Sequence, residues 1–452
     1  MLSLLPDQSR ERFYLSVLTL ASLLRFINLG FKDLQAWDEA LYAVRAEGIV
    51  RYSGWMDQTP FAIDGLYSSL HPPLYVWLTT IAFYLLGVNE FAARFFSALL
   101  GGCTLFVIFW TGKKLVNADV GFLAAMLFGL NPFVTFFSRQ GQFDAALVFF
   151  LSLAIFFLLD TNRIYDKRNT ILAGISLGLA LMTKLYVGLG VPLAYACWVL
   201  MNPEKKEITR WKLFLQLLAI ASLVAVPWHA YMTVVHGGGD PFFFVKASAL
   251  WERTISGIEG NIKPLEAFYF VNQLFVLFPV GVLWFGYGLW NILRQREQSW
   301  LLLASWFVVF FLVVSIVRTK LAVYLLPMLV PASLIAAREI WNAITNSMSS
   351  KRFTLLVGGT LLSVLWSSSQ GWRNATKEII SSLTSFRLPP ADSFMSFLPL
   401  FLLSLFLAAI SFALFRLGWV EYLRRPLIGL IIIPLLIWSV YQITSLETFQ
   451  YR

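Results

Sequence analysis

Long apolar runs separated by short polar connectors make up almost the whole chain. A membrane-spanning helix needs about 20 apolar residues, and polar residues do not alternate along these runs as they would in barrel strands. The pattern predicts an all-α integral membrane protein of about 13 transmembrane helices. The predicted spans lie near residues 12–29, 91–112, 119–137, 142–160, 170–184, 186–200, 212–235, 268–290, 299–317, 321–338, 353–369, 395–416 and 426–445. The stretch 170–200 holds either two short spans or one long span, and thirteen requires two.

Composition supports a membrane protein. Of the 452 residues, 58% are hydrophobic and 13% are charged, whereas soluble proteins carry about 25% charge. The net charge of +10 does not indicate a nucleic-acid partner, because basic residues of membrane proteins collect in cytoplasmic loops. Cys103 and Cys197 both lie in apolar runs and are interpreted as packing residues.

The distribution of basic residues predicts the topology. With a cytoplasmic N-terminus, short inside connectors carry more than half of the 35 Lys and Arg residues, as the positive-inside rule expects. The long loops 30–90, 236–267 and 370–394 then lie outside. Residues 73–87 are apolar but short, and as a span they would reverse this arrangement, so we predict a juxtamembrane helix at the outer interface. The expected location is the plasma membrane, with an extracytoplasmic active site.

An acidic pair stands in the first of these loops, in the sequence Trp37-Asp38-Glu39-Ala40-Leu41-Tyr42. Adjacent residues on a helix point about 100° apart, so one of the two carboxylates at most faces a given site. Either the pair marks a solvated helix N-terminus, or one carboxylate is catalytic.

A second motif follows in the same loop, His71-Pro72-Pro73-Leu74-Tyr75. Proline fixes φ and restricts the residue before it, so the motif is either a plain helix start or a histidine held at the water–lipid boundary. In the second case His71 binds phosphate or metal, although one histidine alone makes a poor metal site.

Isolated charges stand at the outer ends of later spans. Asp144 opens an apolar span and is either an N-cap or a carboxylate aimed into a cavity. Lys184 and Lys320 either snorkel to the interface or bind an anion such as a lipid phosphate, and Arg253, in an outer loop, has the same ambiguity. Carboxylates and cations gathered at the lipid boundary suit one reaction. Cations hold a lipid phosphate while a carboxylate deprotonates an acceptor hydroxyl.

At this point the chain resembles the polytopic GT-C glycosyltransferases, in particular the aminoarabinose lipid A transferases and the protein O-mannosyltransferases. The likeness covers roughly residues 10–340. It rests on the order of the following motifs: Asp38-Glu39-Ala40, His71-Pro72-Pro73-Leu74-Tyr75, Gly87-Val88-Asn89-Glu90-Phe91-Ala92-Ala93-Arg94, Phe143-Asp144, Gly178-Leu179-Ala180-Leu181-Met182-Thr183-Lys184, Pro227-Trp228 and Thr319-Lys320-Leu321-Ala322-Val323-Tyr324-Leu325-Leu326-Pro327.

The resemblance implies a GT-C-like catalytic module over 1–340. Residues 341–452 are expected to hold C-terminal spans and the short outer loop 370–394 with no separate soluble domain, a departure from those family members that carry a large extracytoplasmic C-terminal domain. The resemblance also implies Asp38 as general base or acceptor-orienting carboxylate. The other implied catalytic carboxylates are Asp144 and Glu39. The implied phosphate- or substrate-binding residues are His71, Lys184, Arg253, Lys320, Tyr42 and Tyr75.

The chain also departs from these relatives. Those of the aminoarabinose type carry Lys where this chain has His71, which predicts a weaker or pH-dependent phosphate contact. Some family members use a divalent cation and others do not, so the metal is left open.

The sequence therefore predicts an inverting membrane glycosyltransferase, a hexosyl or pentosyl transferase. Its expected partners are a polyprenyl-phosphate-sugar donor, a lipid, protein or polysaccharide acceptor, and membrane lipids. The first alternative is a flippase of a lipid-linked glycan, which typically shows repeat symmetry with broken helices at the midplane. The second is a non-catalytic scaffold, for which charge substitutions at 38, 144 and 184 are individually tolerated.

Overall fold

The computed structural model describes residues 7–159, 167–201, 207–247, 261–262, 268–345, 348–364 and 366–367. Several predicted features lie outside these residues: Arg253, the loop 370–394 and the last two spans, 395–416 and 426–445. The side chain of Asp38 is also outside the described part, although its backbone is within it.

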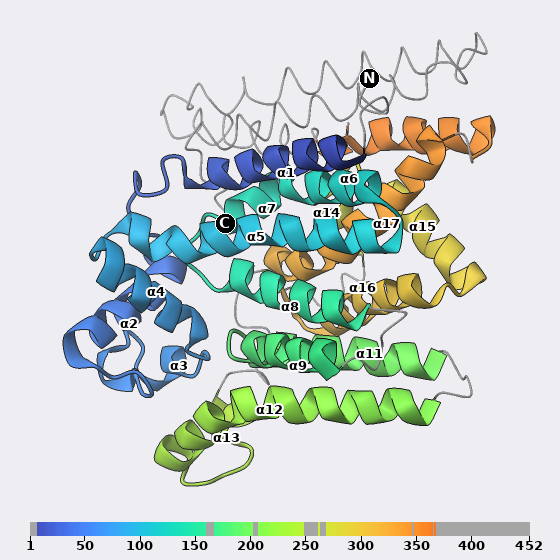
Figure 1. Ribbon diagram of the computed structural model, residues 1–452. Coiled ribbons are helices and arrows are strands. Elements are labelled where there is room, and N and C mark those ends of the chain that lie inside the picture. Colours follow the sequence, from blue (N-terminus) through green and yellow to red (C-terminus); the bar gives the residue numbers. More distant parts are fainter. Residues whose placement is uncertain are drawn as a thin grey trace.

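Most of the described chain is helical, and its longer helices stack in layers across the molecule (Figure 1). In chain order, the helices of this stack are α1 (Asp7–Leu23), α5 (Glu90–Leu115), α6 (Ala118–Gly129), α7 (Pro132–Phe137), α8 (Asp144–Leu158), α9 (Lys167–Leu181) and α12 (Glu207–Gly237). Among the closest neighbours are α5 with α6, α8 with α9, and α9 with α12. The polar connectors stand at the two ends of the stack, so the pattern of apolar runs becomes a bundle with two chemically distinct ends.

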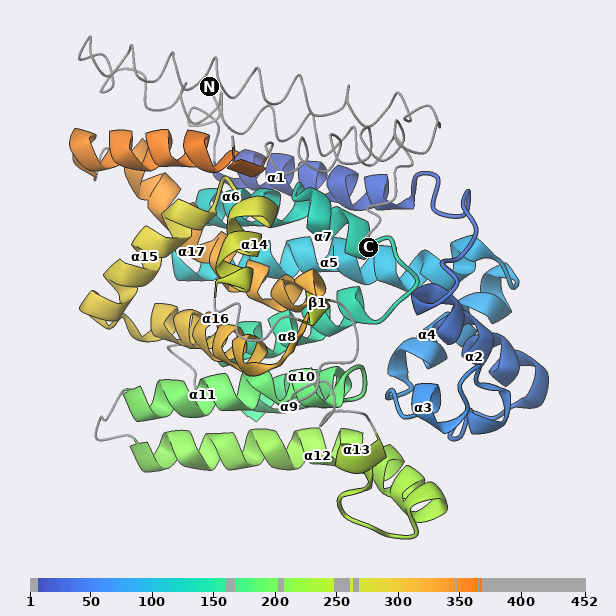
Figure 2. The same cartoon turned by 180° about the vertical axis from the view of Figure 1, so that it is seen from behind.

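A second group of helices covers the other side of the bundle (Figure 2). It consists of α10 (Leu185–Gly188), α11 (Gly190–Met201), α14 (Tyr269–Leu277), α15 (Val282–Gln295), α16 (Gln298–Ile316) and α17 (Leu326–Ile344). Helix α17 is the most deeply placed candidate span, with 83% of its apolar window buried. The strands of the described residues, β1 (Asn261–Ile262) and β2 (Thr319–Lys320), form one short antiparallel pair.

Three helices of the first long loop form a separate cluster at one end of the bundle (Figure 1). They are α2 (Asp38–Tyr52), α3 (Leu66–Ser69) and α4 (Leu74–Leu86). Helix α4 packs mainly against α2 and α5, and part of its surface stays exposed and apolar, including Tyr84 and Leu85. A helix is therefore present where one was predicted over 73–87, and its position at the outer interface stays a prediction. The short helix α13 (Phe243–Ala247) lies at the same end.

The predicted spans are matched in part. Within the described residues, four helices are long and apolar enough to cross a membrane: 90–115, 208–237, 298–316 and 322–344. A bent pair of helices makes a fifth if it counts as one span. Shorter apolar helices occupy the predicted positions 119–137, 142–160 and 186–200. The total of about thirteen therefore stays a prediction.

Two predicted spans are wrong as single helices, and proline accounts for both breaks. The span 268–290 is divided into α14 and α15, which bend by 119° at the break. Pro279 stands in that break and has no N–H to continue a helical ladder. The span 119–137 is divided into α6 and α7, where Asn131 caps the second helix through its side chain and Pro132 is its first residue.

The stretch 170–200 is divided as the thirteen-helix alternative requires. Helix α9 ends at Leu181, and Lys184 precedes α10 and α11. Lys184 therefore lies at a turn between helices instead of inside a continuous apolar helix, and its backbone N–H and C=O are bonded to Ala180 and Gly188.

Glycines allow the closest helix contact of the bundle, between α5 and α6. A Cβ atom at Gly121 would lie 2.2 Å from the carbonyl oxygen of Phe109, and one at Gly112 would lie 2.6 Å from the Cα of Gly121. Small residues at such crossings let backbones approach and maximise dispersion contacts where lipid removes the hydrophobic driving force.

We expect Gly121→Ala to separate α5 from α6 and to lower stability by about 1–3 kcal/mol. The measurement is the thermal midpoint of the purified protein in detergent. Gly286→Ala is the matched control, because a Cβ there meets nothing within 4 Å. Equal midpoints for the two variants would contradict the close contact.

Candidate active site at one end of the bundle

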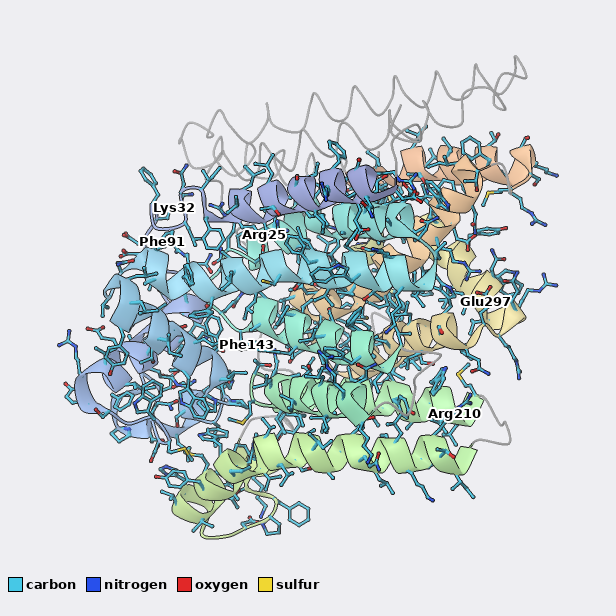
Figure 3. The ribbon with its side chains drawn as sticks, viewed as in Figure 1. Arg25, Lys32, Phe91, Phe143, Arg210 and Glu297 are labelled. Atoms are coloured by element: carbon cyan, nitrogen blue, oxygen red, sulfur yellow. The ribbon has the colours of Figure 1, made fainter. Side chains whose placement is uncertain are left out.

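The candidate residues gather at the end of the bundle that carries α2, α3 and α4. In Figure 3, Lys32, Phe91 and Phe143 lie at this end, whereas Arg210 and Glu297 lie at the opposite end. The described basic connectors also stand at the opposite end, around the α5–α6 and α15–α16 turns (Figure 1). Within the described part of the fold, the candidate site residues and the basic connectors therefore lie at opposite ends of the bundle, as the sequence predicted.

A buried ion pair joins the first loop to the bundle. Arg94 of α5 donates from Nε to Glu39 Oε1 at 2.7 Å and from Nη2 to Glu39 Oε2 at 2.7 Å. Glu39 is 1% exposed and Arg94 is 6% exposed. The backbone N–H groups of Gly141 and Gln35 donate to the same carboxylate, at 2.5 and 2.9 Å. Both carboxylate oxygens of Glu39 are thus already hydrogen-bonded by the protein.

The guanidinium of Arg94 also binds the loop that leads to the acidic pair. It donates to the carbonyl oxygens of Leu29, Lys32 and Asp33 at 2.8–2.9 Å. One arginine therefore fixes the end of the first span, the start of α2 and, through Glu39, the turn at Gly141. We call these contacts of Glu39 and Arg94 the loop clamp.

An aromatic group lies next to the loop clamp. The hydroxyl of Tyr42 is 2.9 Å from Nδ1 of His71. The ring of Tyr42 packs edge-on against Tyr75 and Phe143, with centroids 5.7 and 5.4 Å apart, and His71 packs edge-on against Phe143 at 6.0 Å. Three motifs that are distant in the sequence meet here.

A lysine and a carboxylate complete this group. The ammonium of Lys184 lies 4.5 Å from the ring centroid of Phe143 and 5.7 Å from that of Tyr324, a geometry in which a cation is attracted to the ring face. Asp144 follows Phe143 directly, is 7% exposed, and is the first residue of α8. The capping position of α8 belongs to Phe143, so the N-cap alternative for Asp144 is not supported.

Tyr75 has a structural set of contacts. Its hydroxyl bonds the carbonyl of Ala93 at 3.1 Å and Ser97 Oγ at 2.8 Å, and Ser97 donates to the carbonyl of Gln142 at 3.0 Å. Burial raises the pKa of Tyr75, so the phenol stays neutral. The chain Tyr75–Ser97–Gln142 holds the turn before Asp144 against α5.

The contacts of Lys320 in the described part of the chain are with α16 and Phe270. Its ammonium donates to the carbonyls of Val314 and Ser315, at 3.3 and 2.6 Å, at the C-terminal end of α16, where a cation complements the helix dipole. It also lies 5.4 Å from the ring centroid of Phe270. These contacts favour a structural role, which neither predicted alternative included.

Three buried arginines at this end of the bundle, Arg25, Arg45 and Arg94, had no role in the predicted site. Arg94 appears in a quoted motif but was assigned no function, and the other two were not singled out. A signal for Arg45 exists, because it lies among Tyr42, Ala46 and Ile49 on the buried face of α2. A charge at a helical core position requires a buried partner or ligand.

A further contact joins the first loop to α12. His236, in the last turn of α12, has Nε2 2.8 Å from Asp57 Oδ2, and Trp228 Nε1 donates to the carbonyl of Met56 at 2.8 Å. Burial raises the pKa of Asp57, but hydrogen bonds from Thr59 and His236 outweigh it and hold that pKa below its ordinary value.

A metal site was left open by the sequence. Within the described side chains, no group of three or more His, Cys, Asp or Glu residues could hold a metal ion. The side chain of Asp38 is not among them, so a divalent cation remains an open prediction.

Comparison with known proteins tests the expected family. Residues 70–231 match the family model described as dolichyl-phosphate-mannose-protein mannosyltransferase. The crystal structure of ArnT from Cupriavidus metallidurans bound to undecaprenyl phosphate superposes with a TM-score of 0.67 at 19% identity, covering 95% of this chain and 77% of that one. The resemblance to the GT-C glycosyltransferases is confirmed.

Curated relatives extend this GT-C likeness. The chain is 26% identical over 336 residues to an uncharacterized protein of Aquifex aeolicus (strain VF5), covering 73% of this chain and 64% of that protein. It is 24% identical over 382 residues to the undecaprenyl phosphate-alpha-4-amino-4-deoxy-L-arabinose arabinosyl transferase of Wigglesworthia glossinidia brevipalpis, covering 78% of this chain and 64% of that protein. The matched part is thus about 64% of the length of these relatives.

We expect Glu39→Gln to destabilise the protein by about 3–5 kcal/mol, because it leaves the buried guanidinium of Arg94 without a counter-charge. Glu47→Gln is the matched control on the same helix. Its partner Arg51 is 64% exposed, and such a pair contributes about 0.5 kcal/mol or less. Thermal unfolding of both variants in detergent makes the comparison, and similar losses would refute the importance of the loop clamp.

The contact between Asp57 and His236 predicts a pH-dependent contribution to stability. Because the pKa of Asp57 is lowered in the folded protein, its contribution is present above the unfolded pKa and is lost as the pH falls through the folded one. Asp57→Asn should therefore lower the thermal midpoint at neutral pH, with the difference shrinking below about pH 4. The control is the exposed Asp64→Asn, and a difference independent of pH would contradict the assignment.

Proposed function

We propose that this protein is a membrane glycosyltransferase that transfers a sugar from a polyprenyl-phosphate donor to a hydroxyl or phosphate acceptor on the extracytoplasmic face. The acceptor belongs to a lipid, a protein or a glycan. The observation that carries the proposal is the convergence at Phe143, where Lys184, His71 and Tyr42 meet beside Asp144. These residues come from four separate segments, next to the helix that begins at Asp38.

The proposed roles follow from charge. The ammonium of Lys184 and the guanidinium of Arg253 bind the donor phosphate, with His71 as a further phosphate contact, and Lys320 is a weaker candidate. Asp38 accepts the proton of the acceptor hydroxyl. The acceptor oxygen then bonds the anomeric carbon while the bond from that carbon to the phosphate oxygen breaks. Polyprenyl phosphate leaves with the electron pair, and this single displacement inverts the anomeric configuration.

No general acid is required for this reaction. A phosphate is already a good leaving group, and a fixed cation stabilises the charge that develops on it. Asp144 is the proposed second essential carboxylate, at the positive N-terminal end of α8. For Glu39 we propose a positioning role in place of the catalytic one, because the loop clamp already saturates its carboxylate.

The proposal is tested by sugar transfer with purified full-length protein in nanodiscs. A panel of radiolabelled polyprenyl-phosphate sugars is supplied with crude membrane acceptors. We expect label in an acceptor together with release of polyprenyl phosphate. Asp38→Asn should reduce turnover by about 100-fold or more, because a positioned base contributes about that factor.

Asp64→Asn is the control for this experiment, since that exposed carboxylate stands in the same loop. Normal turnover in Asp38→Asn would overturn the base assignment. Binding of donor lipid without turnover on any acceptor would instead favour the flippase alternative.

A further inference from the structure

Arg45 is a buried cation that contacts His71, one of the residues of the candidate site. Its guanidinium is 0% exposed. It donates to the carbonyl of Ser68 at 2.8 Å, to Gln58 Oε1 at 2.7 Å and to the carbonyl of His71 at 2.9 Å. All three acceptors are neutral, so they satisfy its hydrogen-bonding groups without cancelling its charge.

Arg94 provides the comparison within the same fold. Both arginines are buried, but Arg94 has the carboxylate of Glu39 at 2.7 Å, whereas Arg45 has no carboxylate within 4.0 Å among the described side chains. The Nε–H of Arg45 also lacks a partner there. Burial lowers the pKa of Arg45 to about 10, so the group is charged at neutral pH. A buried charge without a counter-ion is costly.

The location of Arg45 relates this charge to the site. Arg45 follows Tyr42 by one turn of α2, and both side chains contact His71. Arg45 binds the main-chain carbonyl of His71, while the hydroxyl of Tyr42 bonds the imidazole. The guanidinium therefore fixes the backbone of the histidine whose ring packs against Phe143, and the same phenylalanine ring also contacts Lys184.

We propose that Arg45 is a positioning residue whose charge selects an anionic headgroup, so that the donor phosphate supplies the counter-ion that the described side chains do not provide. It acts through His71 and through the electrostatic field in a low-dielectric wall, where charges interact far more strongly than in water. This inference rests on the proposed function, because it assumes that the site receives a lipid phosphate.

The test distinguishes an effect of the charge of Arg45 on phosphate binding from an effect of its hydrogen bonds on the fold. Full-length protein in nanodiscs is titrated with a polyprenyl phosphate and with the uncharged polyprenol of the same length, and the ratio of the two affinities is measured. The wild type should prefer the phosphate. Arg45→Gln should reduce this preference about tenfold, and Arg45→Lys should retain most of it, because lysine keeps the charge but not the planar fork.

Two further variants keep the test decisive if Arg45→Gln fails to fold. Gln58→Glu places a carboxylate against Arg45 and should reduce the phosphate preference similarly. Gln58→Met loses both side-chain hydrogen bonds of Gln58, from Arg45 and to the carbonyl of Trp55, without adding charge and should leave the ratio unchanged. Arg51→Gln controls for net charge on α2, since Arg51 is exposed and paired with Glu47.

The outcomes distinguish the two proposals. A wild type without preference for the phosphate would count against the proposed donor. A wild type that prefers the phosphate, with Arg45→Gln and Gln58→Glu retaining that preference, would overturn the role of Arg45 alone. An equal loss of affinity for phosphate and polyprenol in these variants would assign Arg45 a purely structural role and also overturn the inference.

Discussion

The loop clamp is the constraint on which this end of the molecule depends. A buried carboxylate or guanidinium alone would destabilise the fold by several kcal/mol, and the bidentate pair of Glu39 and Arg94 removes that cost for both. Because the same two side chains also bind Gly141 and three carbonyls of the first loop, the start of α2 and the turn before α8 cannot move independently. The loop clamp therefore holds the start of α2 and the turn before α8 together, and the hydrogen bonds of Tyr75 and Ser97 hold the same turn against α5.

The helix breaks have a related physical basis. A backbone that leaves the helical path exposes N–H and C=O groups, which lipid cannot satisfy. In this fold the turns at Gly141 and Lys184 lie at the end of the bundle, where side chains and neighbouring backbone supply partners, such as the bond from Leu74 N to the carbonyl of Met182 at 3.2 Å. At Gly141 the Glu39 carboxylate accepts from the backbone N–H, so a side chain of the candidate site satisfies the backbone of the turn.

Much of the fold class was readable from the pattern of apolar runs, because lipid imposes length and composition on each helix. The division of 170–200 at Lys184 and a separate helix over 74–86 agree with that pattern. The breaks at Pro279 and Asn131-Pro132 were visible as residues but not as breaks, since proline is tolerated in many membrane helices. The bend of 119° between α14 and α15 follows from how each half packs on its neighbours.

By itself the sequence determined the membrane class, the family resemblance and the set of segments that carry charge, because these depend on local composition and on motif order. Only the tertiary structure decided what each charge does. In the folded protein both carboxylate oxygens of Glu39 are hydrogen-bonded, and Lys320 binds carbonyls at the C-terminal end of α16. Lys184 lies against the ring of Phe143, and Arg45 has no counter-charge among the described residues. The physical reason is that the role of a buried charge depends on its partners within a few ångströms, and those partners come from distant segments that only folding brings together.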